Sequence, residues 1–381
     1  MKILHLCLAS FYIDYYSYQE NLLPKYHKLI GHDVSIVASL KTFSEKGEVD
    51  YLPRSRSYIN EHGISVHRIE YKSGFINRKI GRFKGIKKYL NEKIDLVFVH
   101  GIQFFDFKIV ADSQTKYNYK IIVDNHADYT NSAKNIFSKY FLHKYLWKNH
   151  IKRYDTNICH YFGVLPARVS FLIDLYDAPP EKTSYLRLGI DDKEIEENAS
   201  KDVFSIKKDF NLHNNKKIIV TGGKIDDAKI EVLGLMNLLK EYTDIELVVF
   251  GPVIPKLQKS FNYILSNSKN IKYINWLEPK ESLKLFSIAD LVIFPGRHSV
   301  FWEQVQGLGV PMLIQKNSNT DHFDAIPSVV TYESNEIEEK LTEIISGNKI
   351  KKLRTLAQNL KKSYYYSNIV LETIEVLNKC N

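Results

Sequence analysis

The segment ADLVIFPGRHSVFWEQVQGLGVPMLIQ, residues 289–315, decides the fold class of this chain. It begins with a short apolar run at 290–294, turns through Pro295-Gly296, continues as a short amphipathic stretch and ends in an apolar run at 311–315. A strand, a helix and a second strand in this order form the repeating unit of a parallel sheet. The segment therefore predicts an α/β fold, with polar residues placed directly after a buried strand.

The same alternation of apolar runs and helical stretches extends over most of the chain. A polar stretch at residues 190–215 interrupts it, and the pattern then restarts. With 381 residues the chain is also longer than one hydrophobic core usually supports. We therefore expect two doubly wound, Rossmann-like domains that face a central cleft, at 1–190 and 191–365, and a C-terminal helix at 366–381 that packs back on the first domain. The strands that we predict are residues 2–9, 33–39, 64–69, 95–100, 120–124, 217–222, 245–251, 271–276, 290–294 and 311–315.

Composition narrows the class of protein. No window is apolar over the roughly 20 residues that a membrane span needs, and the N-terminal apolar run is short and lacks a cleavage site. Cys7, Cys159 and Cys380 are too few and too scattered to predict a disulfide framework or a zinc site. We therefore expect a reduced, cytoplasmic protein. Its net charge of +9 suits nucleic acid, an anionic membrane face or a phosphorylated small molecule.

Two segments concentrate the positive charge. Residues 77–93 carry seven Lys or Arg against one Glu, and residues 132–154 carry six Lys or Arg, six aromatic residues and no acid. Helices that lie on a membrane surface combine cations and aromatic residues in this way. Solvated basic faces of ordinary helices explain the first segment equally well. For residues 132–154 we predict docking to an anionic membrane, at its inner face.

Residues after the strands of the second half predict a diphosphate site. Gly222 and Gly223 end one strand, and Lys224 and Lys229 follow, near the start of a helix. Glycines let the backbone approach a phosphate, and a helix N-terminus favours an anion. Lysines at such positions are usually solvated, so this pattern alone is weak.

The opening segment supplies further candidates for the same site. Arg297 and His298 add positive charge, and the hydroxyl of Ser299 and nearby backbone N–H groups would face a second side of the diphosphate. Glu303 or Gln304 would hydrogen-bond the ribose of a nucleotide that carries this diphosphate. A capping serine before a helix is common in any α/β protein. We favour function because a Trp, a Glu and a Gln on one short helix make poor core residues.

Residues at the ends of two neighbouring strands are further candidates to contact the same nucleotide. Gly251 would allow close approach of the backbone to the ligand, and backbone groups at Trp276 and Leu277 could contact the base. A turn glycine and a core tryptophan are equally good interpretations.

In their order along the chain, these motifs resemble GT-B glycosyltransferases of glycosyltransferase family 4. GGKIDDAK, residues 222–229, matches the family's Gly-Arg-x-x-x-x-Lys stretch with Lys224 in place of Arg. VVFGPV, ADLVIFPG, EQVQGLGVP and the junction LRLGIDDKEI follow the family's later motifs and its hinge. Two glutamates precede Gly-x-Pro in that family, whereas Gly296 and Gln304 stand at those positions here, so the donor sugar is left open. His298 or Arg297 would take over the region of the missing glutamate.

The resemblance implies roles in the first half as well. His126, in VDNHADYT, would lie beside the transferred sugar, and Asp128 would point into the same cleft as a second catalytic candidate. Ser10, Phe11 and Tyr12 stand where relatives carry paired glycines, which suggests an altered acceptor pocket, and His100 is a further candidate to line it.

These parts predict a glycosyltransferase that moves a hexose from a nucleotide-diphosphate sugar to a surface-polysaccharide or lipid-linked acceptor. The resemblance implies retention of configuration, with UDP as the default base. No Asp-x-Asp motif follows a strand, so we expect no metal and no cofactor besides the donor. A nucleotide-sugar epimerase of the same fold and a non-catalytic nucleic-acid binder remain alternatives. The phosphate pattern argues against the second, so we expect no nucleic-acid partner.

Overall fold

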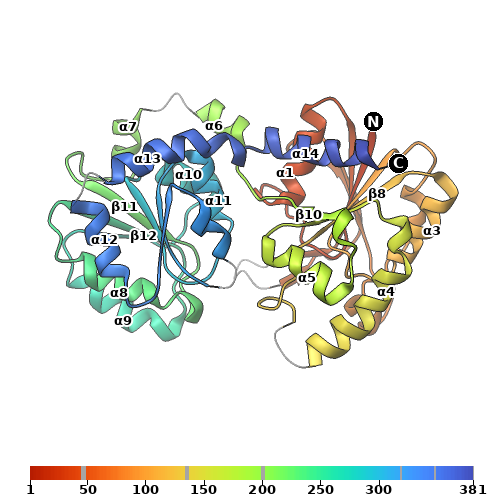
Figure 1. The fold of residues 1–381 in the computed structure, drawn as a ribbon, viewed down its shortest axis with the longest axis horizontal. Helices are drawn as coiled ribbons and strands as arrows, with labels where there is room; N and C mark the ends of the chain where they lie inside the picture. The colour runs from red at the N-terminus through yellow and green to blue at the C-terminus, as the bar shows by residue number, and fades with distance from the viewer. Residues whose placement is uncertain (44–48, 134–136, 199–201, 318–319, 347–348, 381) are drawn as a thin grey trace. The chain divides into compact units, whose positions relative to one another are not determined.

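The computed structural model describes residues 1–43, 49–133, 137–198, 202–317, 320–346 and 349–380. Its contacts divide the chain into two units (Figure 1). Unit 1 comprises Met1–Arg187 together with Tyr366–Asn381, and unit 2 comprises Leu188–Tyr365. The C-terminal segment therefore belongs to the same unit as the N-terminus.

Unit 1 is built on a sheet of eight strands in the order β10-β9-β8-β7-β1-β2-β6-β5. All neighbouring pairs are parallel except β5 and β6, and β3 and β4 form a separate antiparallel pair. Strand order reverses beside β1, because the chain first adds β2 and β6 on one side and then β7 on the other. In such sheets ligands bind at the carboxyl ends of the strands where the order reverses. The strands are β1 Lys2–Cys7, β2 Asp33–Ser39, β3 Lys41–Phe43, β4 Val49–Tyr51, β5 Arg56–Ile59, β6 Ser65–Ile69, β7 Leu96–His100, β8 Lys120–Asn125, β9 His160–Gly163 and β10 Thr183–Tyr185.

Both faces of this sheet are covered by apolar side chains. In β1, Leu4 and Leu6 point into one core, and Ile3 and Cys7 point into the other. Helices α1 and α14 lie side by side over the second face (Figure 1), which also contains His5. The helices of unit 1 are α1 Gln19–Leu29, α2 Phe75–Lys79, α3 Phe107–Tyr117, α4 Lys148–Arg153, α5 Pro166–Tyr176 and α14 Tyr366–Lys379, with a π-helix at Phe137–Trp147 and 3-10 turns at Ile86–Tyr89, Asp155–Asn157 and Pro180–Lys182.

Unit 2 contains a parallel sheet of six strands in the order β13-β12-β11-β14-β15-β16. Its order reverses between β11 and β14, which pair through Ile219↔Leu291 and Val220↔Val292. The strands are β11 Lys217–Gly222, β12 Ile245–Phe250, β13 Ile271–Ile274, β14 Leu291–Phe294, β15 Met312–Gln315 and β16 Val329–Tyr332. The helices are α6 Asp192–Asn198, α7 Val203–Asp209, α8 Glu231–Leu239, α9 Pro255–Ser266, α10 Pro279–Ser287, α11 Phe301–Leu308, α12 Ile337–Ser346 and α13 Lys349–Leu360, with 3-10 turns at Asp227–Lys229, Asp321–Ala325 and Lys361–Tyr364.

All ten predicted strands are present, and so are two sheets of Rossmann type. Strands β3, β4, β5, β9, β10 and β16 were not predicted, because each spans only three or four residues and lacks a long apolar run. The expectation that no cysteines pair was wrong. Cys159 and Cys380 form a disulfide with Cα atoms 5.7 Å apart, which joins the end of α14 to the start of β9. Their separation of 221 residues hid this pairing in the sequence.

In the part of the chain that the structure describes, none of the helices combines the length and the apolar character that spanning a membrane requires.

Candidate functional site

Three glycines at the ends of β11, β12 and β14 build the first candidate site, in unit 2. Gly223, Gly251 and Gly296 have φ of +100°, +111° and +89°, a backbone conformation that glycine adopts readily. A Cβ on Gly251 would overlap the backbone of Gly223, and a Cβ on Gly296 would overlap the carbonyl oxygen of Ala228. The loops therefore pack directly on one another. The close backbone approach that was predicted at Gly251 is therefore to the loop of Gly223 in the same unit.

Lys229 lies against these loops with its ammonium buried. The residue is 7% exposed, and its Nζ donates a hydrogen bond of 3.2 Å to the carbonyl oxygen of Gly222. Burial, and after it the charge of Arg297, lowers the pKa of Lys229 from 10.5 to about 8, although Asp226 acts in the opposite direction. Removing an ammonium from water without an anion beside it is unfavourable. The position therefore suits an anionic ligand. Lys224 is exposed.

The neighbouring loop supplies a second cation. Arg297 extends into solvent with 58% of its side chain exposed, and its Nη2 lies 3.5 Å from Oδ2 of Asp226. Asp226 also caps the turn that carries Lys229, because its Oδ1 accepts from the backbone N–H of Ala228 at 3.0 Å. The turn is thus held by a carboxylate on one side, and Lys229 is held by the glycine loops on the other.

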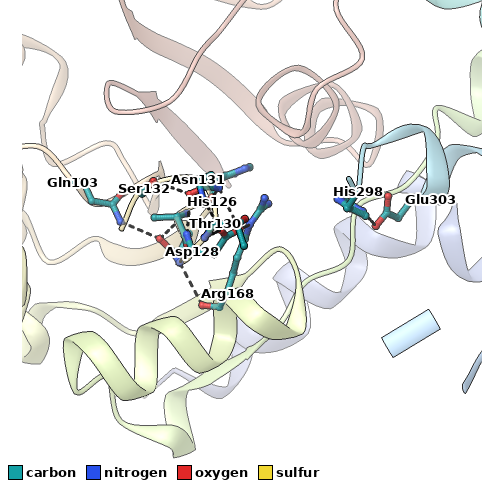
Figure 2. A network of polar contacts seen from close by, with 11 residues as sticks. Gln103, His126, Asp128, Thr130, Asn131, Ser132, Arg168, His298 and Glu303 are labelled. Atoms are coloured by element: carbon teal, nitrogen blue, oxygen red, sulfur yellow. Dashed lines mark hydrogen bonds and ion pairs between the residues drawn. The ribbon is translucent and has the colours of Figure 1, made fainter. Parts of the chain in front are cut away.

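His298 does not point into solvent but toward α11. Its Nε2 lies 2.9 Å from Oε1 of Glu303, and the two side chains are 7% and 0% exposed (Figure 2). Helix α11 begins at Phe301, two residues after Ser299, whose Oγ accepts from the Phe301 N–H at 3.3 Å. This hydroxyl is therefore engaged by its own helix.

The argument that α11 carries poor core residues was wrong. Trp302 and Glu303 are 0% exposed and Gln304 is 4% exposed, and Trp302 packs in the core beneath the sheet. Of the two ribose candidates, Glu303 has one carboxylate oxygen committed to His298. Gln304 follows it in α11 and is also buried.

The loop after β13 places the aromatic ring of Trp276 in solvent. Trp276 is 60% exposed, and its Nε1 donates to Oε1 of Glu278 at 3.3 Å. Leu277, next to it, packs partly against the core of unit 2. The interpretation of Trp276 as a core tryptophan is therefore wrong, and its exposed ring is available to a ligand.

The second candidate site, in unit 1, is built around His126 after β8. Its Nε2 lies 3.2 Å from Oδ1 of Asp124 and 3.8 Å from Oε1 of Glu20, without hydrogen-bond alignment, and 31% of the side chain is exposed. Burial alone would lower the pKa of His126, but the carboxylates of Asp124 and Glu20 outweigh it and raise the pKa. The two carboxylates therefore favour the protonated form of the imidazole, and both lie on the side of its Nε2.

Asp128 has a structural role that conflicts with the catalytic one predicted for it. Its Oδ1 accepts from Thr130 and Asn131, and its Oδ2 accepts from Nε of Arg168 at 3.0 Å (Figure 2). The residue is 2% exposed. Burial would raise the pKa of Asp128, but these donors and Arg168 lower it. We assign Asp128 to holding the loop that carries His126, because its oxygens are already occupied.

Two of the acceptor candidates are too deeply buried to contact an acceptor. Tyr12 is 1% exposed, its hydroxyl accepts from Nδ2 of Asn60 at 2.9 Å, and His100 is 0% exposed. Both predictions are therefore corrected. Ser10 is half-buried, and Phe11, also half-buried, stacks on Phe43 with ring centroids 4.4 Å apart.

One group of histidine and acidic side chains among the described residues is compact enough to consider for a metal. Ligand atoms of His100, Asp124 and His126 all lie within 4.8 Å of one another. Nδ1 of His100 is only 2.6 Å from Oδ2 of Asp124, whereas neighbouring oxygens around a small divalent ion lie about 3 Å apart. This contact has the geometry of a hydrogen bond with a proton between the two atoms.

The basic segment 132–154 is described in part, since residues 134–136 lie outside the described residues. Trp147 is 7% exposed and belongs to the core of unit 1, so it is not available to a membrane. Tyr140 and Tyr145 are 53% and 66% exposed, and Lys144 is exposed beside them.

Sequence reasoning missed several residues that shape the sites. Asp124 and Glu20 flank His126, and Arg168 holds Asp128. Asp124 could have been found, because it follows three apolar residues at the end of a predicted strand, two residues before His126. Glu20 and Arg168 are distant in sequence and carried no signal.

No protein-family model matches the sequence, and no characterised protein matches it by sequence. Solved structures match over its full length. Sucrose-phosphate synthase from Thermosynechococcus elongatus aligns over 99% of this chain and 98% of its own, at 11% identity and a TM-score of 0.68. HepE from Anabaena, in complex with UDP and glucose, aligns over 100% of both chains at 12% identity and a TM-score of 0.65. UDP-GlcNAc 2-epimerase from Neisseria meningitidis, bound to UDP-GlcNAc, aligns over 100% of both chains at 15% identity and a TM-score of 0.61.

At these identities the likeness establishes the fold. The protein has the GT-B fold, with two Rossmann-like α/β domains, which confirms the predicted fold class. The same fold is shared by transferases and by an epimerase, so the activity has to be argued from the residues of the two sites.

Proposed function

We propose that this protein is a glycosyltransferase that moves a hexose from a nucleotide-diphosphate sugar to a polysaccharide or lipid-linked acceptor. The observation that carries the proposal is the buried ammonium of Lys229, seated against Gly222 and Gly223 where the strand order of unit 2 reverses. An ammonium whose pKa is lowered by burial gains most from an anion that replaces its lost hydration. A diphosphate supplies that anion.

The donor site follows from this assignment. Lys229 contacts the diphosphate from its buried position against the glycine loops, and Arg297 and Lys224 reach it from exposed positions. The exposed ring of Trp276 packs against the base, and Gln304 or Glu303 binds the ribose. HepE, a protein of the same fold, is described with UDP and glucose bound, which supports a UDP-sugar as donor.

The transfer step needs stabilisation of the negative charge that develops on the leaving diphosphate. Lys229 and Arg297 supply positive charge for this purpose, so the proposed reaction requires no metal. His126 lies at the reacting sugar, where its protonated Nδ1 donates to a sugar oxygen. We propose retention of configuration, as the sequence resemblance implies.

The acceptor is proposed to be membrane-associated. Tyr140, Tyr145 and Lys144 form an exposed basic and aromatic surface on unit 1 that suits the interface of an anionic bilayer. The proposed location is therefore the cytoplasmic face of a membrane. Binding to vesicles of anionic lipid should weaken when both tyrosines and Lys144 are replaced with Ala, and unchanged binding would contradict this part of the proposal.

A screen of donors tests the activity. Thermal stability is measured with UDP-, GDP- and ADP-sugars, and sugar transfer to lipid-linked acceptors is then followed with the donor that stabilises the protein. Lys229→Ala should abolish both effects, whereas Lys259→Ala, an exposed lysine on α9, should change neither. Normal turnover by Lys229→Ala would refute the assignment. A sugar product formed from the donor alone, without acceptor, would favour an epimerase.

A further inference from the structure

Three histidines form a buried row in unit 1 that the proposed chemistry does not use directly. His5, His27 and His100 are each 0% exposed. Side chains alternate between the faces of a strand, so His5 in β1 lies on the same face as Ile3 and Cys7, which α1 and α14 cover. A polar ring on this apolar face is unfavourable unless both of its nitrogens find partners.

Each nitrogen of the row does find a partner, and the contacts are continuous. Nε2 of His27 lies 2.9 Å from Oγ1 of Thr373 on α14, and Nδ1 of His27 lies 3.1 Å from Nε2 of His5. Nδ1 of His5 lies 3.0 Å from Nε2 of His100. Nδ1 of His100 lies 2.6 Å from Oδ2 of Asp124. We call Thr373, His27, His5 and His100 the histidine chain.

The histidine chain ends at the carboxylate of Asp124, which faces His126. Oδ2 of Asp124 is occupied by His100, while Oδ1 accepts from the backbone N–H of Gly101 at 3.0 Å and lies 3.2 Å from Nε2 of His126. Burial would raise the pKa of Asp124, but His100 and His126 lower it, so the carboxylate is ionised and accepts on both oxygens. His100 therefore has to present an N–H from its Nδ1.

The N–H on Nδ1 of His100 constrains where the protons of the other imidazole rings in the histidine chain lie. A neutral imidazole that donates from Nδ1 accepts at Nε2. If His100 is singly protonated and donates to Asp124, His5 donates from Nδ1 to His100, and His27 donates from Nδ1 to His5. Nε2 of His27 is then an acceptor, and the hydroxyl of Thr373 is the donor that completes the chain. Burial, and after it neighbouring imidazoles, lowers the pKa of His5, and that of His27 to about 3, which agrees with neutral rings.

Thr373 is suited to this role. Its Oγ1 also lies 2.7 Å from the carbonyl oxygen of Val370, one turn earlier in α14. The hydroxyl has one proton and two acceptors within reach, this carbonyl oxygen and Nε2 of His27, and the histidine chain requires that the proton is donated to His27. Donated to His27, this proton sets the direction of the hydrogen bonds from α14 to Asp124.

We propose that the histidine chain positions the Asp124–His126 pair for sugar transfer, with Thr373, His27, His5 and His100 as positioning residues. This inference rests on the proposed role of His126. The chain holds Asp124 in one orientation and leaves its Oδ1 to His126, in the way that partners of a functional histidine fix its orientation.

The first test uses NMR of the imidazole nitrogens in the unmodified protein. His5, His27 and His100 should each show one tautomer, with the proton on Nδ1. A proton on Nε2 of His5 or His27 would overturn the proposal. This measurement needs neither a variant that folds nor a known substrate.

The second test compares Thr373→Val, which keeps the shape but cannot donate, with Thr373→Ser, which keeps the hydroxyl. Thr373→Val should lower kcat by about tenfold or more and leave the KM for the donor within about twofold, because the donor binds in unit 2. Thr373→Ser should restore kcat. Equal kcat in Thr373→Val and the unmodified protein would overturn the proposal while leaving the transferase assignment intact.

A third readout separates failure of the inference from failure of the proposed function. If the unmodified protein transfers no sugar, the transferase proposal fails, and the NMR signals of His126 still test the chain. Thr373→Val should shift these signals and Thr373→Ser should not. Unchanged His126 signals in Thr373→Val would overturn the inference.

Discussion

Replacing Lys229 with Met should make the empty protein more stable and should reduce the stabilisation that the donor provides. Methionine keeps the length of the side chain and removes the charge. The drop in the pKa of Lys229 from 10.5 to about 8 corresponds to an unfavourable free energy of roughly 3 kcal/mol for the buried ammonium, as an upper bound. For a domain the size of unit 2, each kcal/mol shifts the melting temperature by about 2–4 °C.

The dependence on pH has a defined sign. The pKa of Lys229 is lower in the folded chain than in the unfolded chain, so the unfolded chain binds more protons between about pH 8 and pH 10.5. Stability of the empty protein should therefore rise with pH over this window. Below pH 8 the unfavourable term is present in full. The Lys229→Met variant should lack this rise.

Ligand binding opposes this gain in stability. A charge-assisted hydrogen bond to a diphosphate is worth about 1.5–3 kcal/mol, so Lys229→Met should bind a UDP-sugar about 10–100-fold more weakly. Calorimetric unfolding with and without donor measures both changes, and Lys259→Met on α9 is the matched control. A variant that is less stable when empty, yet binds the donor normally, would refute the assignment of Lys229 as a ligand-binding cation.

Three further predictions concern the frame of the sites. Gly251→Ala should destabilise unit 2 by more than the about 1–3 kcal/mol of backbone strain expected for Gly31→Ala, because Gly31 also has positive φ but open space around it; urea unfolding of both variants checks this. Cys380→Ser should lower the unfolding free energy by about 2–4 kcal/mol under oxidising conditions, and a reductant should abolish the difference from the unmodified protein. His126→Gln should reduce stability near pH 6 but not near pH 9. The pKa of His126 is raised in the folded state, so its contribution is complete below the unfolded-state pKa and is lost as pH rises through the folded-state value; denaturant unfolding at both pH values would expose a constant difference if this is wrong.

The sequence was sufficient for the sheets because their strands are buried on both faces. Residues 218–220 and 247–250 are continuously apolar, and the structure contains β11 and β12 there. Strand β9, HYFG, was missed because it begins with a histidine and spans only His160–Gly163. Short strands near the edge of a sheet depend on their neighbours for stability more than on their own composition.

The site was predictable in its positions and not in its contacts. Glycine and lysine after β11 follow from the rule that ligands bind at strand ends, which needs only the strand boundaries. The burial of Lys229 depends on how three loops pack, and no local pattern encodes it. The prediction of a catalytic role for Asp128 failed for a different reason, because a polar residue after a strand serves a ligand or its own loop equally well. Its hydrogen bonds to Thr130 and Asn131 decide for the loop.

The return of α14 to unit 1 has a consequence for synthesis of the protein. Helix α14 supplies Tyr366, Ile369, Val370 and Leu377 to a core whose other members come from the first half of the chain. During translation this face of the sheet, with Tyr26 and Leu22, stays uncovered while all of unit 2 is made. An apolar surface exposed for that long on the ribosome invites aggregation, so the nascent chain should depend on chaperones until residues 366–379 emerge.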